Sequence, residues 1–273
     1  MSKSAIDKLI SGMTKPSTVR RVLNAMGQAF KLSRLPLVSR VHPWLRPDKT
    51  DMRWLPINED IQLPGDAPMP LNLLDRIIEE ASHRVIYKDC GCRVAYECKE
   101  YPIDVGCLLM GDSAIEGSHF SSREVSVEEA KEHSRRAVDA GLVPVVGKAR
   151  VDNFLFGIKD RSRLLTVCFC CECCCITRFA RNANMKTLDP MFPRLDGVTI
   201  KVNDDCIGCG KCAEHCYIQA IEMTDGKAVI GGYCRACGRC ATVCPEDAIE
   251  VRIDDPEFLE KAYDRIRTYV KFD

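Results

Sequence analysis

Two cysteine runs near the end of the chain constrain the fold more than any other feature. The first, CIGCGKCAEHC, begins at Cys206, and the second, CRACGRCATVC, begins at Cys234. Both follow the pattern C-x2-C-x2-C-x3-C, and each cysteine of the second run lies 28 residues after its counterpart. This spacing is typical of two cubane [4Fe–4S] clusters, because three cysteines of each run ligate one cluster and the fourth ligates the other.

The duplicated pattern assigns each cysteine to a cluster. We expect the first cluster to bind Cys206, Cys209, Cys212 and Cys244. We expect the second cluster to bind Cys234, Cys237, Cys240 and Cys216. Between the runs, MTDGKAVI predicts a hairpin that turns at Asp225-Gly226. A pair of four-cysteine zinc sites is the alternative, but zinc requires neither this spacing nor a ligand exchanged between repeats.

Residues 198–253 resemble the bacterial dicluster ferredoxin family in these cysteines and their order. The resemblance implies a small domain that transfers single electrons between protein partners and has little room for substrate chemistry. One position departs from the family. The proline that follows the fourth cysteine is present as Pro245, whereas Tyr217 stands in its place in the first run. We expect altered packing beside one cluster, with ligation retained.

Composition narrows the class of protein. The chain has 273 residues, 18 cysteines and a formal net charge of zero, so nothing in its charge favours nucleic-acid binding. It contains no apolar window of about twenty residues and begins with no secretory signal, so we expect a cytoplasmic protein without a transmembrane segment. Cysteines in such a chain favour metal binding over disulfides, and clustered thiols favour an oxygen-poor cell. No nucleotide- or flavin-binding motif is present.

Ten further cysteines lie upstream in two groups. The first group is Cys90, Cys92, Cys98 and Cys107. The second group is the run VCFCCECCCI, with Cys168, Cys170, Cys171, Cys173, Cys174 and Cys175. If the chain is extended at Cys90 and Cys92, both point to one side, and the other two members complete a four-thiolate set. Arg93 is placed to neutralise thiolate charge.

The six-cysteine run is expected to divide between two tasks, because adjacent side chains diverge in regular structure. Some of its cysteines would complete an iron–sulfur or metal site with the first group. The others would line a second centre or act as redox thiols. A structural zinc ion in the first group and inert packing of some thiols remain as alternatives. His119 is the one histidine considered as a ligand.

The order C-x-C-R, CC-x-CCC and dicluster ferredoxin over residues 70–253 resembles multi-cluster iron–sulfur proteins of anaerobic bacteria and archaea. The resemblance specifies a cysteine order and no substrate. Paired cysteines are also similar to those of the heterodisulfide-reductase type of non-cubane cluster, but the CCG element of that type is absent.

We predict an α+β fold in four parts. These are a basic helical segment (1–66), a cysteine-rich central domain (67–190), the ferredoxin domain (198–253) and a terminal helix (254–273). Apolar residues at helical spacing predict helices near 6–13, 19–30, 71–78 and 258–270. Ser126 and Glu129 form a capping box before another helix, which Gly141 ends, and GLVPVV predicts a buried strand. Eleven basic against three acidic residues in 1–55 suggest either a solvated face, a docking surface or a peripheral membrane contact.

Three functions remain open from sequence. The favoured one is an electron-transfer protein or redox subunit, which exchanges electrons between a partner protein and a further cysteine-bound centre. The alternative is a reductase that acts on a small thiol, disulfide or activated alkene at the upstream cysteines. The third is storage or delivery of metal.

Overall fold

The computed structural model of the chain describes residues 16–35, 38, 50–56, 70–117, 121–149, 151–253 and 255–269. The helix predicted near 6–13 and the candidate ligand His119 lie outside these ranges. Among the described helices, none combines the length and the apolar character that crossing a membrane requires.

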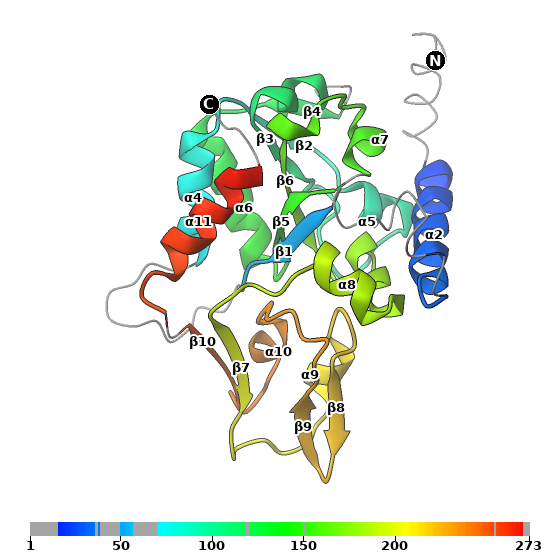
Figure 1. Cartoon of the computed structure of the whole chain (residues 1–273), viewed down its shortest axis with the longest axis vertical. Coiled ribbons are helices and arrows are strands. Elements are labelled where there is room, and N and C mark those ends of the chain that lie inside the picture. The colour runs from blue at the N-terminus through cyan, green and yellow to red at the C-terminus, as the bar shows by residue number, and fades with distance from the viewer. Residues whose placement is uncertain are drawn as a thin grey trace.

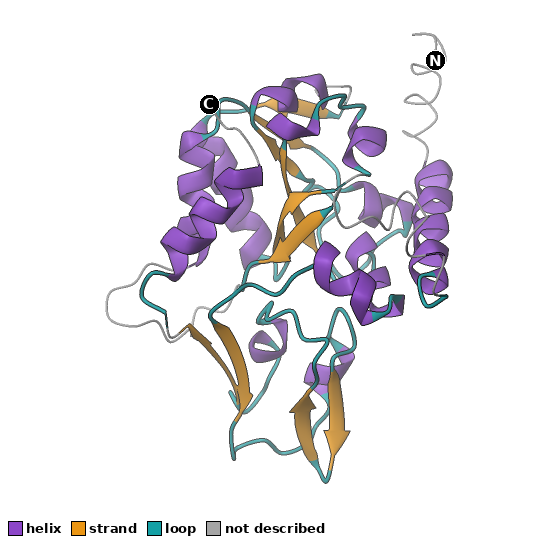
Figure 2. Cartoon of the chain, in the orientation of Figure 1, coloured by secondary structure: helices purple, strands orange, loops and turns teal. Residues whose placement is uncertain are grey.

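A six-stranded antiparallel sheet forms the centre of the molecule (Figures 1 and 2). Its strand order is β1-β5-β6-β3-β2-β4. The strands are β1 (Asp51–Trp54), β2 (Arg84–Tyr87), β3 (Leu108–Met110), β4 (Ser122–Glu124), β5 (Val143–Lys148) and β6 (Leu165–Cys170). The predicted strand GLVPVV is therefore β5, whose residues 143–146 are buried. The strand β1 comes from the predicted N-terminal segment and pairs with β5.

Three long helices pack on one side of this sheet, α4 (Pro70–Glu80), α6 (Val127–Asp139) and α11 (Phe258–Tyr269) (Figure 1). The helix α4 buries Leu74, Ile77 and Ile78, as their spacing predicts. The capping box of α6 is confirmed, since Ser126 and Glu129 bond reciprocally, and Gly141 follows the helix with a φ of 78°. Helix α11 rests on α4, where the Arg76 guanidinium lies 3.7 Å from the Tyr263 ring centre.

Other helical elements cover the other side of the sheet (Figure 1). They are α2 (Pro16–Leu32), α5 (Gly91–Ala95), α7 (Asp152–Phe156), η5 (Ile176–Asn182) and α8 (Met185–Met191). The 3-10 turns η3 (Asp112–Gly117) and η4 (Arg161–Arg163) connect strands. Helix α2 buries Leu23, Met26 and Phe30 and contacts α5 and η5. Helix α2 corresponds to the helix predicted near 19–30, and it packs against this side of the sheet.

The ferredoxin-like part continues below the sheet (Figure 1). It contains β7 (Val198–Val202), α9 (Lys211–Glu214), β8 (Ile221–Thr224), β9 (Lys227–Ile230), α10 (Arg239–Thr242) and β10 (Ile249–Ile253). Strands β8 and β9 form the predicted hairpin around Asp225-Gly226, and both turn residues have positive φ as a type I′ turn requires. Strand β10 pairs with β7. One continuous apolar core joins this part to the sheet, because Tyr217 and Ala236 belong to the same buried cluster as Phe169.

Candidate iron–sulfur and cysteine sites

The two ferredoxin runs fold into matching loops. Gly208 has a φ of 71°, and a Cβ atom there would lie 2.1 Å from the carbonyl oxygen of Gly226, so only glycine fits. Ala236 occupies the equivalent position of the second loop with a φ of 55°. Gln219 and Asp247, which follow the fourth cysteines at equal distance, also share positive φ, at 53° and 48°. The sequence repeat is therefore a structural repeat.

Backbone amides of both loops point at the cysteine sulfurs. The amide of Ala220 donates to Cys216 Sγ at 3.2 Å, and its repeat partner Ala248 donates to Cys244 Sγ at 3.3 Å. Hydrogen bonds from the amides of Ala228 and Gly208 lower the pKa of Cys206. Donors of this kind stabilise thiolate charge. None of the eighteen cysteines forms a disulfide bond. Eight thiols in this duplicated, amide-lined frame fit two cubane clusters.

The two predicted cluster sites differ in exposure. Cys209 of the first set is exposed, and its neighbour Ile207 is 64% exposed. In the second set, burial raises the pKa of Cys237 to about 12 and that of Cys240 still further. We call the first set the outer site and the second set the inner site. The outer site faces solvent, whereas the inner site faces the sheet.

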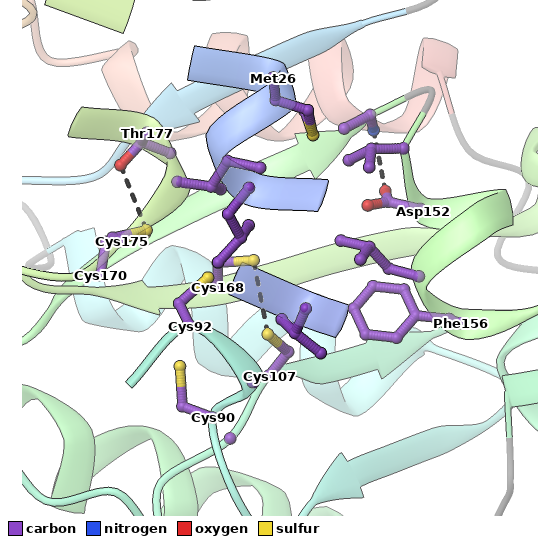
Figure 3. A pocket seen from close by; sticks show the side chains of 18 of the residues that line it. Met26, Cys90, Cys92, Cys107, Asp152, Phe156, Cys168, Cys170, Cys175 and Thr177 are labelled. Carbon is purple, nitrogen blue, oxygen red and sulfur yellow. Dashed lines mark hydrogen bonds between the residues drawn. The ribbon is translucent and has the colours of Figure 1, made fainter. Parts of the chain in front are cut away.

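The ten upstream cysteines separate into two groups of four and six. The first, which we call the four-cysteine site, gathers sulfur atoms that all lie within 4.8 Å of one another. Its members are Cys98, Cys171, Cys173 and Cys174. The second, which we call the six-cysteine pocket, lines a hollow of about 420 Å³ (Figure 3). Its cysteines are Cys90, Cys92, Cys107, Cys168, Cys170 and Cys175.

This division corrects the expected four-thiolate set of Cys90, Cys92, Cys98 and Cys107. The chain is not extended across Cys90 and Cys92, because α5 starts there. That helix leads the chain away from Cys90 and Cys92. Cys98 therefore lies beside Cys173, with 3.6 Å between their sulfur atoms. Cys107 instead meets Cys168, at 3.5 Å. The six-cysteine run does divide, with 171, 173 and 174 on one side and 168, 170 and 175 on the other. Each part meets members of the first group, whereas only one part was expected to do so.

The four-cysteine site has the dimensions of a single tetrahedral ion. With metal–sulfur bonds of about 2.3 Å, the ligand sulfurs of such an ion lie about 3.8 Å apart. A cubane cluster spreads its ligands more widely, because each thiolate binds a different iron atom. The hydrogen bond from Cys173 lowers the pKa of Cys171 to about 7, which favours its thiolate form. Four thiolates in this geometry suit zinc or a single iron ion.

Two arginines flank the four-cysteine site. Arg93 is fully buried and donates to the carbonyl oxygens of Phe169, at 2.8 Å, and Val105. Burial lowers its pKa, but the charges of Cys90 and Cys171 outweigh burial and raise it. Arg178 donates to the carbonyl oxygen of Cys173. Arg93 thus carries out the neutralising role expected from its place after Cys92.

A polar junction connects the inner site to the six-cysteine run. Glu172 accepts hydrogen bonds from Tyr101, at 2.7 and 2.9 Å, and pairs with His215 Nδ1 at 2.8 Å. Arg239 lies 3.6 Å from the same carboxylate and donates to Tyr101. Despite burial, which raises the pKa of Glu172, the bond with His215 and its other partners hold that pKa below its usual range. A carboxylate between Cys171 and Cys173 is thus bonded directly to the residue before Cys216.

Tyr217 forms the second link across this junction. Its side chain is 2% exposed, and its hydroxyl donates to the carbonyl oxygen of Cys170 at 2.8 Å. The departure from the family's proline therefore has a structural purpose, since proline has no group that reaches Cys170. The sequence singled out Tyr217 and placed His215 beside the cluster, but it contained no signal for the partners Glu172 and Tyr101.

Comparisons with known proteins agree with the ferredoxin part. The family described as the 4Fe-4S dicluster domain matches residues 205–248. This match supports a dicluster ferredoxin segment at residues 205–248, and domains of this kind transfer single electrons with a redox partner. Searches of the curated proteins and of the solved structures find no match to the chain. The four-cysteine site indicates an additional metal-binding site outside the dicluster domain.

Proposed function

We propose that this chain is an electron-transfer protein or redox subunit. In this proposal the dicluster domain exchanges single electrons with a partner protein on its outer side and with a cysteine-bound centre on its inner side. An oxygen-poor cytoplasm is its proposed setting, because clustered cysteines oxidise readily. The clusters, when bound by the eight ferredoxin cysteines, supply one-electron redox chemistry.

The outer side has the character of a docking face. Near the outer site, the apolar side chains of Ile207 and Val229 are 64% and 49% exposed. An apolar face beside an exposed ligand such as Cys209 suits brief contact with a redox partner, because it excludes water from the contact while the partner's cofactor approaches.

The observation that carries the proposal is the junction on the inner side. Tyr217 follows Cys216 directly and bonds the backbone of Cys170 at 2.8 Å. Glu172 connects the same run to His215 at 2.8 Å. A domain that served only as a carrier would need no buried, hydrogen-bonded attachment to a second set of ten thiols. The attachment holds the inner site at a fixed separation from those thiols.

The test measures electron delivery. The full chain is purified without oxygen, reduced with dithionite, freed of excess reductant and mixed with an oxidised c-type cytochrome. We expect each chain to deliver at least about two electrons, one from each cluster. The matched variant Cys240→Ser, which alters the inner site alone, is expected to deliver fewer. A reduced chain that transfers no electrons to the cytochrome would contradict the proposal.

The pocket supports a second candidate, the reductase. Its volume of about 420 Å³ lies in the range of small-molecule sites, and apolar residues such as Leu23, Met26 and Phe156 line it. A dialkyl disulfide bound there would take two electrons from the clusters and two protons to give two thiols. Adding such a disulfide to the reduced chain should restore the visible absorption of the oxidised clusters. An unchanged spectrum would exclude this substrate class.

A further inference from the structure

Six thiols from separate segments converge on one pocket. Cys90 and Cys92 come from the start of α5, Cys107 precedes β3, Cys168 and Cys170 belong to β6, and Cys175 follows the run's last turn. Side chains alternate along β6, so Cys168 and Cys170 share one face, while Phe169 on the other face meets His133 of α6. Figure 3 shows the labelled cysteines gathered around the same space. Their convergence is a property of the fold, not of sequence proximity.

The arrangement of these six sulfurs does not suit a single ion. Among the described residues, the four-cysteine site is the one group of three or more metal-ligating side chains whose atoms all lie within 4.8 Å. The pocket sulfurs instead meet in pairs. Cys107 lies 3.5 Å from Cys168, and Cys170 lies 2.7 Å from Cys175. Thiolates that are spread around a hollow fit a multinuclear cluster, because each iron atom takes its own ligand.

The remaining wall offers little to a polar organic ligand. Leu23, Met26 and Phe30 of α2 form one side, and Phe156 of α7 forms another. Two polar side chains of the lining, Asp152 and Thr177, already have hydrogen-bond partners. Asp152 accepts from the amide of Ala149 at 2.8 Å and from Thr166 at 3.0 Å. Thr177 donates to Cys175 at 3.3 Å. The six thiols are therefore the most numerous groups of the lining that can bind a ligand, beside the carboxylate of Asp89.

A buried cation supports a negatively charged occupant. Arg93 follows Cys92 in the chain, and the charges of Cys90, Cys171 and Cys107 stabilise its buried guanidinium. This cation therefore lies between the four-cysteine site and two thiols of the pocket. A buried guanidinium favours anionic neighbours. Thiolates that hold an iron–sulfide core at Cys90 and Cys107 would keep negative charge beside it.

We propose that the six-cysteine pocket binds an iron–sulfur cluster of several irons, separate from the dicluster and from the four-cysteine site. The proposal deepens the function proposed above, because it identifies the centre beyond the inner site. Cys170 provides the connection: its side chain faces the pocket while its carbonyl oxygen accepts the bond from Tyr217. The six thiols then differ in role from the four that fit one ion.

The experiment counts iron and inorganic sulfide in the full chain after anaerobic reconstitution with ferrous iron and sulfide. We expect the unaltered chain to hold clearly more than about eight of each, the content of two cubane clusters. The double variant Cys107→Ser/Cys168→Ser is expected to return to about eight sulfides and to keep no iron beyond the dicluster and the single ion of the four-cysteine site, with the reduced dicluster EPR signals unchanged. Those signals report that the variant has folded.

A matched variant separates the two upstream sites. Cys98→Ser alters the four-cysteine site, so it should lose a single metal ion and keep all excess sulfide. About eight sulfides in the unaltered chain, zinc without extra sulfide, or excess sulfide that survives the double variant would each overturn the pocket cluster. Electron delivery to the cytochrome is measured on the same samples. Delivery of about two electrons by the double variant would leave the electron-transfer function standing, whatever the pocket contains.

Discussion

The variant Tyr217→Phe tests the junction between the dicluster domain and the six-cysteine run. It keeps the buried ring and removes only the hydroxyl that donates to the carbonyl oxygen of Cys170 at 2.8 Å. The side chain is 2% exposed, so water does not easily replace the lost donor. The carbonyl is then left without its buried partner. Removing one partner of a buried hydrogen bond costs about 1–3 kcal/mol.

This cost applies to local opening of the junction. Each 1.4 kcal/mol changes an equilibrium constant by about tenfold, so opening should become about 5- to 150-fold more frequent. Hydrogen exchange of the native protein under anaerobic conditions measures that frequency. We expect faster exchange in the segment after Cys216 and at the end of β6, with the outer site unaffected.

A matched tyrosine provides the control. Tyr233 lies in the same domain but is 37% exposed, and Tyr233→Phe should change stability by no more than about 0.5 kcal/mol. If both variants exchange at the same rate in both segments, Tyr217 does not hold the junction and the argument from its hydroxyl is wrong.

Three other predictions concern the loops, a buried histidine and the four-cysteine site. Gly208→Ala should lose iron from the outer site, because the new Cβ would lie 2.1 Å from the Gly226 carbonyl oxygen. The control Gly232→Ala should keep all iron, because a Cβ atom at that position would meet no atom within 4 Å. Burial lowers the pKa of His133 although its Nε2 bonds the Gly106 carbonyl oxygen at 2.9 Å. The unfolded chain therefore binds more protons just below about pH 6.5, and stability falls as the pH drops through that range. The thermal midpoint should decrease more between about pH 7.5 and 5.5 in the unaltered chain than in His133→Gln, and equal decreases would count against this assignment. Cys98→Ser should release one metal ion in native mass spectrometry, and an unchanged mass would mean that its thiol holds none.

The ferredoxin part was predictable because its information is local. The Asp225-Gly226 turn lies directly between the two strands that it joins, and the cysteine spacing within each run can be recognised without the rest of the fold. The helices α4 and α6 were predictable for the same reason, since apolar spacing and a capping box specify each of them without the rest of the fold.

The upstream site was less predictable because its contacts are distant in sequence. Cys98 meets Cys173 across 75 residues, and Cys107 meets Cys168 across 61. Only the sheet order, which brings β3 beside β6, places them together. One local signal was available: LTVCFC alternates in the period of a strand, which predicts that Cys168 and Cys170 share a face. The sequence did not reveal that the first group of cysteines separates. The segment C-G-C is compatible with an extended chain as well as with the helix that the structure begins after Cys90.

The most direct test of the account is the metal content and EPR spectrum of the full chain, isolated without oxygen and without reconstitution. We predict a brown protein with at least about eight irons and as many inorganic sulfides, whose reduced form gives the spectrum of two interacting one-electron centres. A colourless protein that contains zinc and no sulfide would contradict the claim that these cysteines bind iron–sulfur clusters.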